Sequence, residues 1–245
     1  MKTIISVKNL TKSFGAFTAV NNISFDVCKG EIFGFLGANG AGKTTAMRML
    51  CGLSIPSSGS GNVAGFDILT QSEQIKRHIG YMSQRFSLYN DLTVKENMRL
   101  FATIYGLCRA EFEKRAADIL KRLDFTSEEN TLVGSLPLGW KQKLSFAVAT
   151  LHKPGIVFLD EPTGGVDPIT RRQFWEMIYE AADSGTTIFV TTHYMDEAEY
   201  CNRISIMVDG VIKALDTPAC LKRKYKADSM DEVFKILARD AKRGE

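Results

Sequence analysis

The sequence predicts an α/β protein built around a mainly parallel β-sheet, and three observations lead to this fold class. Short apolar runs alternate with helical patterns in the second half, where Gly155–Leu159, Thr170–Ala182 and Thr186–Thr191 form a β-α-β order typical of parallel strands. A long stretch with helical periodicity interrupts this order, which indicates an inserted helical unit. The chain has 245 residues, 44% of them hydrophobic and 24% charged, so it is long enough for one domain with an insertion.

The first elements are three short strands and a helix. Strands are expected at Ile4–Val7, at Ile23–Val27 with its apolar alternation, and at Glu31–Leu36. The third strand leads directly into a glycine-rich turn, which is followed by a helical pattern over Lys43–Cys51. This strand–turn–helix order is the context in which phosphate-binding loops occur.

The middle of the chain changes to helical periodicity from Leu92 to Leu123. Apolar residues recur there at spacings of three and four: Val94, Met98, Phe101, Ile104 and Tyr105, then Phe112, Ala116, Ile119, Leu120 and Leu123. The tail from Met230 to Ala238 also has apolar residues on one side and is expected to dock as a helix.

Composition excludes several classes of protein. The formal charge is only +3, from 31 basic and 28 acidic side chains, which is too small to indicate nucleic acid as a partner. The sequence lacks an apolar run of about 20 residues that could span a membrane, and its first residues do not resemble a secretory signal. The five cysteines are widely spaced without a C-x-x-C pair, so reduced thiols are expected rather than disulfides or zinc.

A phosphate-binding loop is the clearest motif in the sequence. The pattern G-x-x-x-x-G-K-[ST] is complete between an expected strand and an expected helix. Its backbone N–H groups and the helix start would hold the β-phosphate, the lysine would neutralise β- and γ-phosphate oxygens, and the first threonine would bind Mg²⁺. The residues expected to bind nucleotide are Gly37, Ala38, Asn39, Gly40, Ala41, Gly42, Lys43, Thr44 and Thr45.

Two acids follow the apolar run that begins at Ile156 and would lie at the carboxyl edge of the parallel sheet. Asp160 is expected beside the Mg²⁺. Glu161 would point the other way and accept a proton from the attacking water, a role worth about 10²–10⁴-fold in rate. His193 comes after another strand and is expected at the same edge as a catalytic contact to the γ-phosphate.

The order of these motifs resembles the nucleotide-binding subunit of ATP-binding cassette (ABC) transporters over essentially the whole chain. The resemblance implies that Phe14 stacks on adenine and that Gln84, after a strand, is the Q-loop residue that binds nucleotide and metal. It also implies that Asp160 and Glu161 are the Walker B pair, that Gly164–Asp167 is the D-loop and that His193 is the switch histidine. The late segments Thr192–Glu199 and Asp231–Phe234 resemble the subgroup paired with ABC-2 type permeases, which includes drug exporters.

The resemblance implies an organisation as well as a site. The fold would be a P-loop NTPase core with a mainly parallel sheet, an N-terminal antiparallel β subdomain and an inserted α-helical subdomain. Residues 1–84 and 151–220 would form the nucleotide-binding core, 85–150 the helical subdomain and 221–245 a helical tail. The chain would be a Mg-dependent ATPase on the cytoplasmic face of the cell membrane, bound to an ABC-2 type permease and paired with a second cassette, either identical or different.

One motif departs from the family pattern. The signature reads L-S-G-G-Q in the family, whereas this chain has Leu136-Pro-Leu-Gly-Trp140. Pro137 has no hydroxyl or N–H to offer, Leu138 adds a side chain where glycine allows close approach to phosphate, and only Gly139 keeps its expected nucleotide contact. Trp140 would either compensate or be a core aromatic without a nucleotide contact. The D-loop departs too, with Gly164 in place of the usual serine.

These departures leave other functions open. The resemblance implies an ATP-hydrolysing subunit that powers an ABC-type exporter; the alternatives are a weakly hydrolytic nucleotide-binding partner in an asymmetric cassette pair, or a soluble ABC ATPase outside transport. The sequence does not identify the transported substrate, and it leaves open whether the chain is one cassette of a fused protein.

Overall fold

A computed structural model describes residues 2–84, 88–239 and 241. Its main sheet has six strands in the order β10-β9-β3-β8-β7-β6. The strands β3 (Ile32–Leu36), β6 (Ile79–Met82), β7 (Ile156–Asp160), β8 (Thr187–Thr192) and β9 (Arg203–Val208) are parallel, and β10 (Val211–Asp216) pairs antiparallel with β9. The predicted α/β class with a mainly parallel sheet is therefore confirmed.

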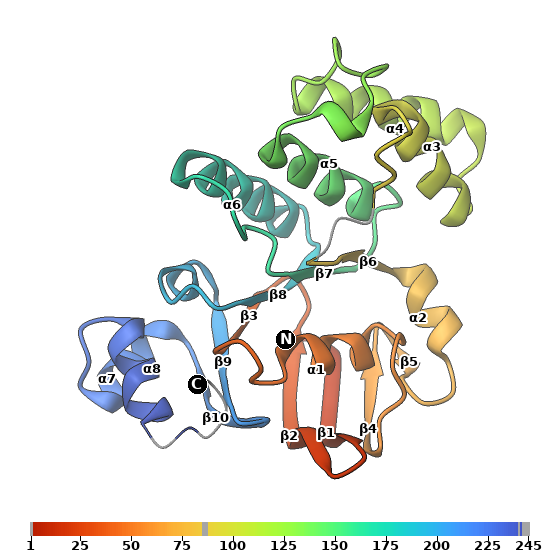
Figure 1. Cartoon of the computed structure of the whole chain (residues 1–245). Coiled ribbons are helices and arrows are strands. Elements are labelled where there is room, and N and C mark those ends of the chain that lie inside the picture. The colour runs from red at the N-terminus through yellow and green to blue at the C-terminus, as the bar shows by residue number, and fades with distance from the viewer. Residues whose placement is uncertain (1, 85–87, 240, 242–245) are drawn as a thin grey trace.

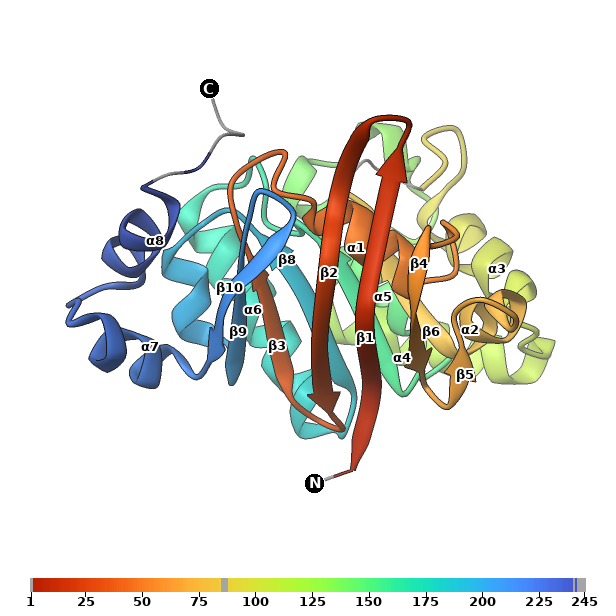
Figure 2. The same ribbon diagram turned by 90° about the horizontal axis from the view of Figure 1, so that it is seen from below.

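A second, antiparallel sheet covers one face of the first (Figures 1 and 2). Its order is β2-β1-β4-β5, formed by β1 (Thr3–Phe14), β2 (Phe17–Cys28), β4 (Ser58–Val63) and β5 (Phe66–Asp67). The helix α1 (Lys43–Leu50) lies between the two sheets, because its apolar residues face both. This arrangement confirms the predicted N-terminal antiparallel unit.

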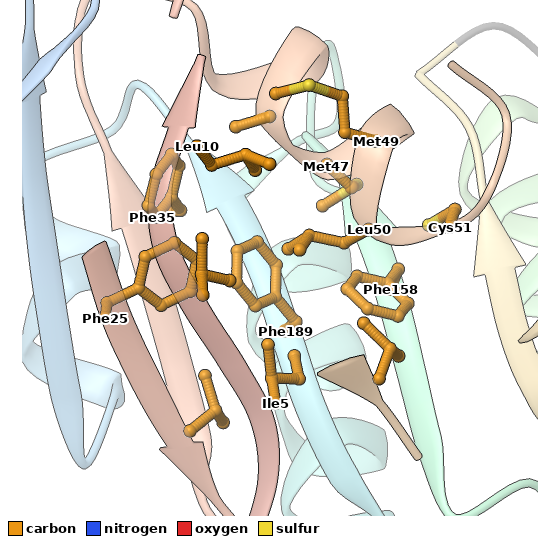
Figure 3. Close-up of a cluster of buried hydrophobic side chains, with 14 of the residues drawn as sticks. Ile5, Leu10, Phe25, Phe35, Met47, Met49, Leu50, Cys51, Phe158 and Phe189 are labelled. Carbon is orange, nitrogen blue, oxygen red and sulfur yellow. The ribbon is translucent and has the colours of Figure 1, made fainter. Parts of the chain in front are cut away.

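Aromatic side chains fill the space between the sheets (Figure 3). Phe25 of β2 packs against Phe33 and Phe35 of β3 with ring centroids 5.6 Å apart, and Phe189 of β8 lies 5.4 Å from Phe35 and 5.3 Å from Phe158. Such pairs stabilise a core beyond the area that they bury. The strand that leads into the phosphate loop is therefore packed against the antiparallel sheet through this cluster.

The helical insertion has a hydrophobic core of its own. It comprises α3 (Val94–Ile104), α4 (Arg109–Arg122), the short 3₁₀ turn η1 (Val133–Ser135) and α5 (Leu138–Thr150), which lie together above the main sheet in Figure 1. Thr93 begins α3 with a capping box, accepting from the N–H of Glu96 while Glu96 accepts from the N–H of Thr93.

Helix α5 joins this unit to the main sheet. Leu144 and Val148 belong to the helical core, whereas Phe146 and Ala149 belong to the core against the sheet, so both faces of the helix are buried. The helix approaches β6 so closely that a Cβ at Gly80 would lie 2.2 Å from the carbonyl oxygen of Ala149. This contact requires glycine at position 80.

The remaining helices complete the fold. They are α2 (Ser72–His78), α6 (Pro168–Asp183), the 3₁₀ turn η2 (Asp196–Tyr200), α7 (Pro218–Tyr225) and α8 (Met230–Ala238). Helix α6 covers the face of the sheet opposite the antiparallel strands, and α7 and α8 pack at the β10 end, as Figure 1 shows. Among the described residues, no helix is both long and apolar enough to cross a membrane.

The structure differs from the expected elements in several places. The first two strands extend to twelve residues each, because their bulged pairing continues beyond the apolar runs. The predicted start of the tail at residue 221 falls inside α7, which begins at Pro218 and is capped by Thr217. Residues 85–87 of the predicted helical subdomain, and 240 and 242–245 of the predicted tail, lie outside the described residues.

Candidate functional site

The phosphate loop joins the end of β3 to the start of α1 and approaches neighbouring backbone closely. A Cβ at Gly37 would lie 2.4 Å from the carbonyl oxygen of Met207, and one at Gly42, whose φ is +106°, would lie 2.5 Å from that of Ala19. Only glycine fits at these two positions. Helix α1 begins at Lys43 without a side-chain cap and without an acid in its first turn, so its first N–H groups can receive an anion.

Lys43 is buried in its own loop. Its ammonium donates to the carbonyl oxygens of Gly37 at 2.7 Å and Ala38 at 3.1 Å, and lies 3.3 Å from Oε1 of Glu161. Burial lowers the pKa of Lys43, and the neighbouring Glu161 carboxylate opposes that shift. The Glu161 carboxylate therefore lies next to the Lys43 ammonium, which the sequence predicts to bind ATP phosphates.

Asp160 ends β7 and faces the first turn of α1. Its Oδ1 accepts from the hydroxyl of Thr44 at 3.0 Å and from that of Thr191 at 2.6 Å. Burial raises the pKa of Asp160, and these two hydroxyl donors oppose the shift.

These oxygens suit Mg²⁺. The ion takes oxygen ligands and is usually held in nucleotide sites by one or two protein groups together with phosphates and waters. The Thr44 hydroxyl and the Asp160 carboxylate are such groups, and they lie within hydrogen-bond distance of each other. Within the described ranges, no cluster of three or more His, Cys, Asp or Glu side chains could hold a metal.

Glu161 collects contacts from three other predicted site residues. Its Oε2 accepts from Nε2 of Gln84 at 3.0 Å and lies 3.0 Å from Nδ1 of His193, while Oε1 faces Lys43. The backbone of Glu161 has φ +49°, unusual for a residue other than glycine, and its N–H donates to the carbonyl and hydroxyl oxygens of Thr191. The two acids thus have different side-chain partners: Asp160 accepts from the Thr44 and Thr191 hydroxyls, whereas Glu161 contacts Lys43, Gln84 and His193.

Phe14 and Gly139 lie outside this group of contacts. Phe14 ends β1 at the turn into β2, where 55% of its surface is exposed and the Lys12 ammonium lies 5.1 Å from its ring. Gly139 lies in the first turn of α5, where a Cβ would approach Cγ2 of Thr170 at 2.6 Å. Within the described chain, neither residue makes any of the contacts that join Lys43, Glu161 and His193.

The altered signature begins α5 and packs against the D-loop. Pro137 is the N-cap and provides no side-chain hydrogen bond, whereas Leu138 lies near Gly165 and is 44% exposed. Trp140 stacks on Phe125 with ring centroids 4.6 Å apart and planes 11° apart, so it is part of the helical unit's packing. The structure thus favours the packing role for Trp140 over compensation for the missing signature glycine.

Asp167 lies at the end of the D-loop, which packs against the start of α5. Its carboxylate caps α6, accepting from the N–H groups of Ile169 and Thr170 and from the Thr170 hydroxyl. These bonds lower the pKa of Asp167. The D-loop therefore ends in a fixed turn beside Gly139.

The sequence reasoning missed two residues that contact the site. Thr191 bridges Asp160 and Glu161, and its place on β8 beside Asp160 on β7 could have been predicted from the parallel register. Gln142 donates to the carbonyl of Gly164 at 3.1 Å, and its buried Oε1 has no hydrogen-bond partner among the described residues. Gln142 lines a cavity of about 190 Å³ together with Gln84 and Glu161.

Comparison with known proteins gives consistent matches. A family model described as ABC transporter matches residues 20–164. The chain is 44% identical over 244 residues to the probable multidrug ABC transporter ATP-binding protein YbhF of Escherichia coli K12, covering 98% of this chain and 42% of that protein. It is 36% identical over 228 residues to the linearmycin resistance ATP-binding protein LnrL of Bacillus subtilis 168, covering 93% of this chain and 73% of LnrL.

A solved structure agrees with these matches. A protein described as the ATP-binding subunit of an ABC transporter superposes with a TM-score of 0.87 at 30% identity, covering 96% of this chain and 99% of the other. The chain spans about two fifths of the length of YbhF and nearly three quarters of LnrL.

Proposed function

The chain belongs to the ABC transporter family and is an ATPase cassette of that family, and we propose that it powers an exporter in a membrane. The exporter role is supported by the relatives named for multidrug transport and linearmycin resistance. In this proposal two cassettes close around Mg-ATP and reopen after hydrolysis.

One observation carries the proposal for the site. Side chains from the phosphate loop, β7, the segment after β6 and the segment after β8 meet at a single carboxyl edge of the parallel sheet, with Glu161 in contact with Lys43, Gln84 and His193. Ligands of open parallel sheets bind at this edge. The same edge has the backbone N–H groups of α1, which suit phosphate.

The residues would divide the chemistry as follows. Lys43 neutralises phosphate oxygens, and the loop from Gly37 to Thr45 binds the phosphates through its N–H groups. Thr44 and Asp160 would hold Mg²⁺, with Gln84 as a further oxygen ligand, and the ion would supply neutralisation of developing phosphate charge. Glu161 accepts the proton of the attacking water, and His193 orients Glu161 and contacts the γ-phosphate.

Two further residues would contact the adenine ring and the phosphate bound by a second cassette. Phe14 stacks on the adenine ring, for which its exposed face at the β1–β2 turn is available. Gly139 contacts the phosphate bound by a second cassette. Because Pro137 offers no hydroxyl or N–H and Leu138 adds a side chain where glycine allows close approach to phosphate, this contribution is weak, which favours a weakly hydrolytic partner in an asymmetric pair as the second candidate.

The proposal also covers the organisation of the chain and its partners. The nucleotide-binding core is residues 1–84 and 151–220, the helical subdomain 85–150 and the tail 221–245. A second cassette, identical or different, and an ABC-2 type permease complete the exporter, and the chain is peripheral on the cytoplasmic face of the cell membrane. We expect no nucleic acid among the partners, because the net charge of +3 is too small to be a nucleic-acid footprint by itself.

Replacing the phosphate-loop lysine tests the site. Lys43→Ala should abolish ATP binding measured by calorimetry, because the charge facing the phosphates is lost. Lys95→Ala is the matched control, since Lys95 forms a part-exposed pair with Glu129 in the helical unit. An ATP affinity that is the same in Lys43→Ala and in the wild type would contradict the assignment.

A further inference from the structure

Glu197 is a fully buried carboxylate that none of the proposed catalytic steps uses. It lies in η2, four residues after His193, and 0% of its surface is exposed. Its Oε1 accepts from the hydroxyl of Thr163 at 2.5 Å, and its Oε2 accepts from the hydroxyl of Thr192 at 2.6 Å. Arg171 completes the environment, with Nε 3.7 Å from Oε1.

These three partners come from separate segments that border the nucleotide site. Thr163 lies two residues after Glu161 at the entry to the D-loop, Thr192 ends β8 directly before His193, and Arg171 lies in the first turns of α6. A buried charge is costly unless it is paired and hydrogen-bonded, so the carboxylate is stable only while all three segments keep this arrangement. Glu197 therefore ties the loop after β7 to the loop after β8.

The same arrangement fixes the ring of His193. The Thr192 hydroxyl that donates to Glu197 also accepts from the N–H of Tyr194 at 3.0 Å, which shapes the backbone around the histidine. The Tyr194 ring packs 4.2 Å from the imidazole on one side, and the Arg171 guanidinium lies 4.3 Å from the Tyr194 ring. His193 Nδ1 lies 3.0 Å from Oε2 of Glu161. The backbone and the Tyr194 ring that position the imidazole are in turn connected to Glu197 through Thr192 and Arg171.

We infer that Glu197 is a positioning residue of the ATPase site: its buried carboxylate holds His193 against Glu161 by bonding Thr192 and Thr163 at once. This inference rests on the proposed ATPase function for its kinetic consequence, but its structural consequence is independent of turnover. Glu197 has no path to the nucleotide except through these neighbours, because its side chain is completely enclosed.

Two variants test whether Glu197 positions His193, and neither changes the shape of the side chain much. Glu197→Gln keeps the size of the side chain but removes the charge, and Thr163→Val removes one hydroxyl donor while keeping a β-branched side chain. Thr163→Val also serves if Glu197→Gln fails to fold. The matched control is Thr187→Val, because Thr187 is equally buried at the other end of β8 and its hydroxyl accepts one bond from the N–H of Gly30 at 2.9 Å.

Imidazole NMR gives a readout that does not require hydrolysis. The chain has three histidines, His78, His152 and His193, so a spectrum of the whole protein is simple to assign with the variant His193→Ala. We expect Glu197→Gln and Thr163→Val to shift the His193 resonances and leave those of His78 and His152 unchanged. Thr187→Val should leave all three unchanged. Unmoved His193 resonances in a folded Glu197→Gln or Thr163→Val protein would overturn the inference.

Kinetic measurements then distinguish a positioning role of Glu197 from a role in the stability of the fold. We expect Glu197→Gln to lower kcat for ATP hydrolysis about ten- to hundredfold with KM changed less than about twofold, because misplacing a reacting group by about 1 Å has such effects. In a His193→Ala background Glu197→Gln should have little further effect on kcat. Full additivity of the two changes would overturn the inference. A wild-type chain without ATPase activity but with the NMR shifts would reject the proposed function and keep the positioning role.

Discussion

The ion pair between Lys43 and Glu161 leads to a quantitative prediction about nucleotide affinity. Both side chains are less than 10% exposed, and their charged atoms are 3.3 Å apart. At an effective dielectric constant of about 20, the attraction between the two charges is about 5 kcal/mol before solvation is counted. ATP must compete with this pair, because the same ammonium is needed for the phosphates.

Replacing Glu161 by Gln should therefore strengthen ATP binding while greatly slowing hydrolysis. The neutral amide lacks the negative charge that pairs with Lys43, and a hydrogen bond to a charged group is worth about 1.5–3 kcal/mol, so ATP affinity should rise by about tenfold or more. Without nucleotide the variant should be less stable by about 3 kcal/mol, because a buried ammonium loses its counter-charge. Turnover should fall by about 10²–10⁴-fold with the loss of the base.

Calorimetry with a non-hydrolysable ATP analogue measures the affinity, and thermal unfolding with and without the analogue measures the stability. Glu129→Gln is the matched control, since Glu129 pairs with Lys95 at 3.2 Å in a part-exposed position. That variant should keep the wild-type ATP affinity. An affinity of Glu161→Gln equal to or weaker than that of the wild type would refute the reasoning that the internal pair opposes nucleotide binding.

Three further predictions concern Asp160, Trp140 and the signature. Asp160→Asn should stabilise the nucleotide-free protein against urea near neutral pH and much less at about pH 4. Burial raises the pKa of this carboxyl above its value in the unfolded chain, so the cost of its charge grows as the pH rises from the unfolded pKa and is complete above the folded pKa. An equal gain at both pH values would contradict this. Trp140→Ala should lower the free energy of unfolding by about 2 kcal/mol by removing the stack on Phe125, with ATP affinity by calorimetry unchanged. The triple change Pro137→Ser, Leu138→Gly and Trp140→Gln should raise the ATPase rate of the chain; no rise would mean that the native signature already supports hydrolysis.

Much of the fold was predictable because its strongest signals are local. The strand ending at Leu36, the glycine turn and the helix from Lys43 are adjacent in sequence, and the structure places α1 at Lys43–Leu50. The helical periodicity between Leu92 and Leu123 likewise corresponds to α3 and α4. Local spacing of this kind survives folding, because packing of an apolar face reinforces it.

Other elements depend on partners that the sequence does not place. Strand β4 reads Ser-Gly-Ser-Gly-Asn-Val, a composition typical of loops, and it is a strand because it pairs with β1. The strands β9 and β10 were not expected either, although they form the edge of the main sheet. Tertiary pairing overrides local preference in both cases.

In the site too, local motifs were predictable and contacts between distant residues were not. The motifs predicted Asp160, Glu161 and His193 individually, since each lies at or just after the end of an apolar strand. They could not show that Lys43 pairs with Glu161, nor that Glu197 is buried between two threonines, because these contacts join residues distant in sequence. A glutamate in a polar segment such as 196–199 is usually exposed, so composition alone pointed away from burial.

The close contact between Gly80 and Ala149 gives helix α5 the geometry of a lever. The contact fixes the helix near its last turn, and Leu138 at the other end is eleven residues away, about 16 Å at 1.5 Å per residue. A tilt of about 10° around this fulcrum displaces the signature end by about 3 Å, the length of one hydrogen bond. Any tilt of α5 would thus pivot at Gly80, where the absence of a side chain lets the helix approach the edge strand of the sheet.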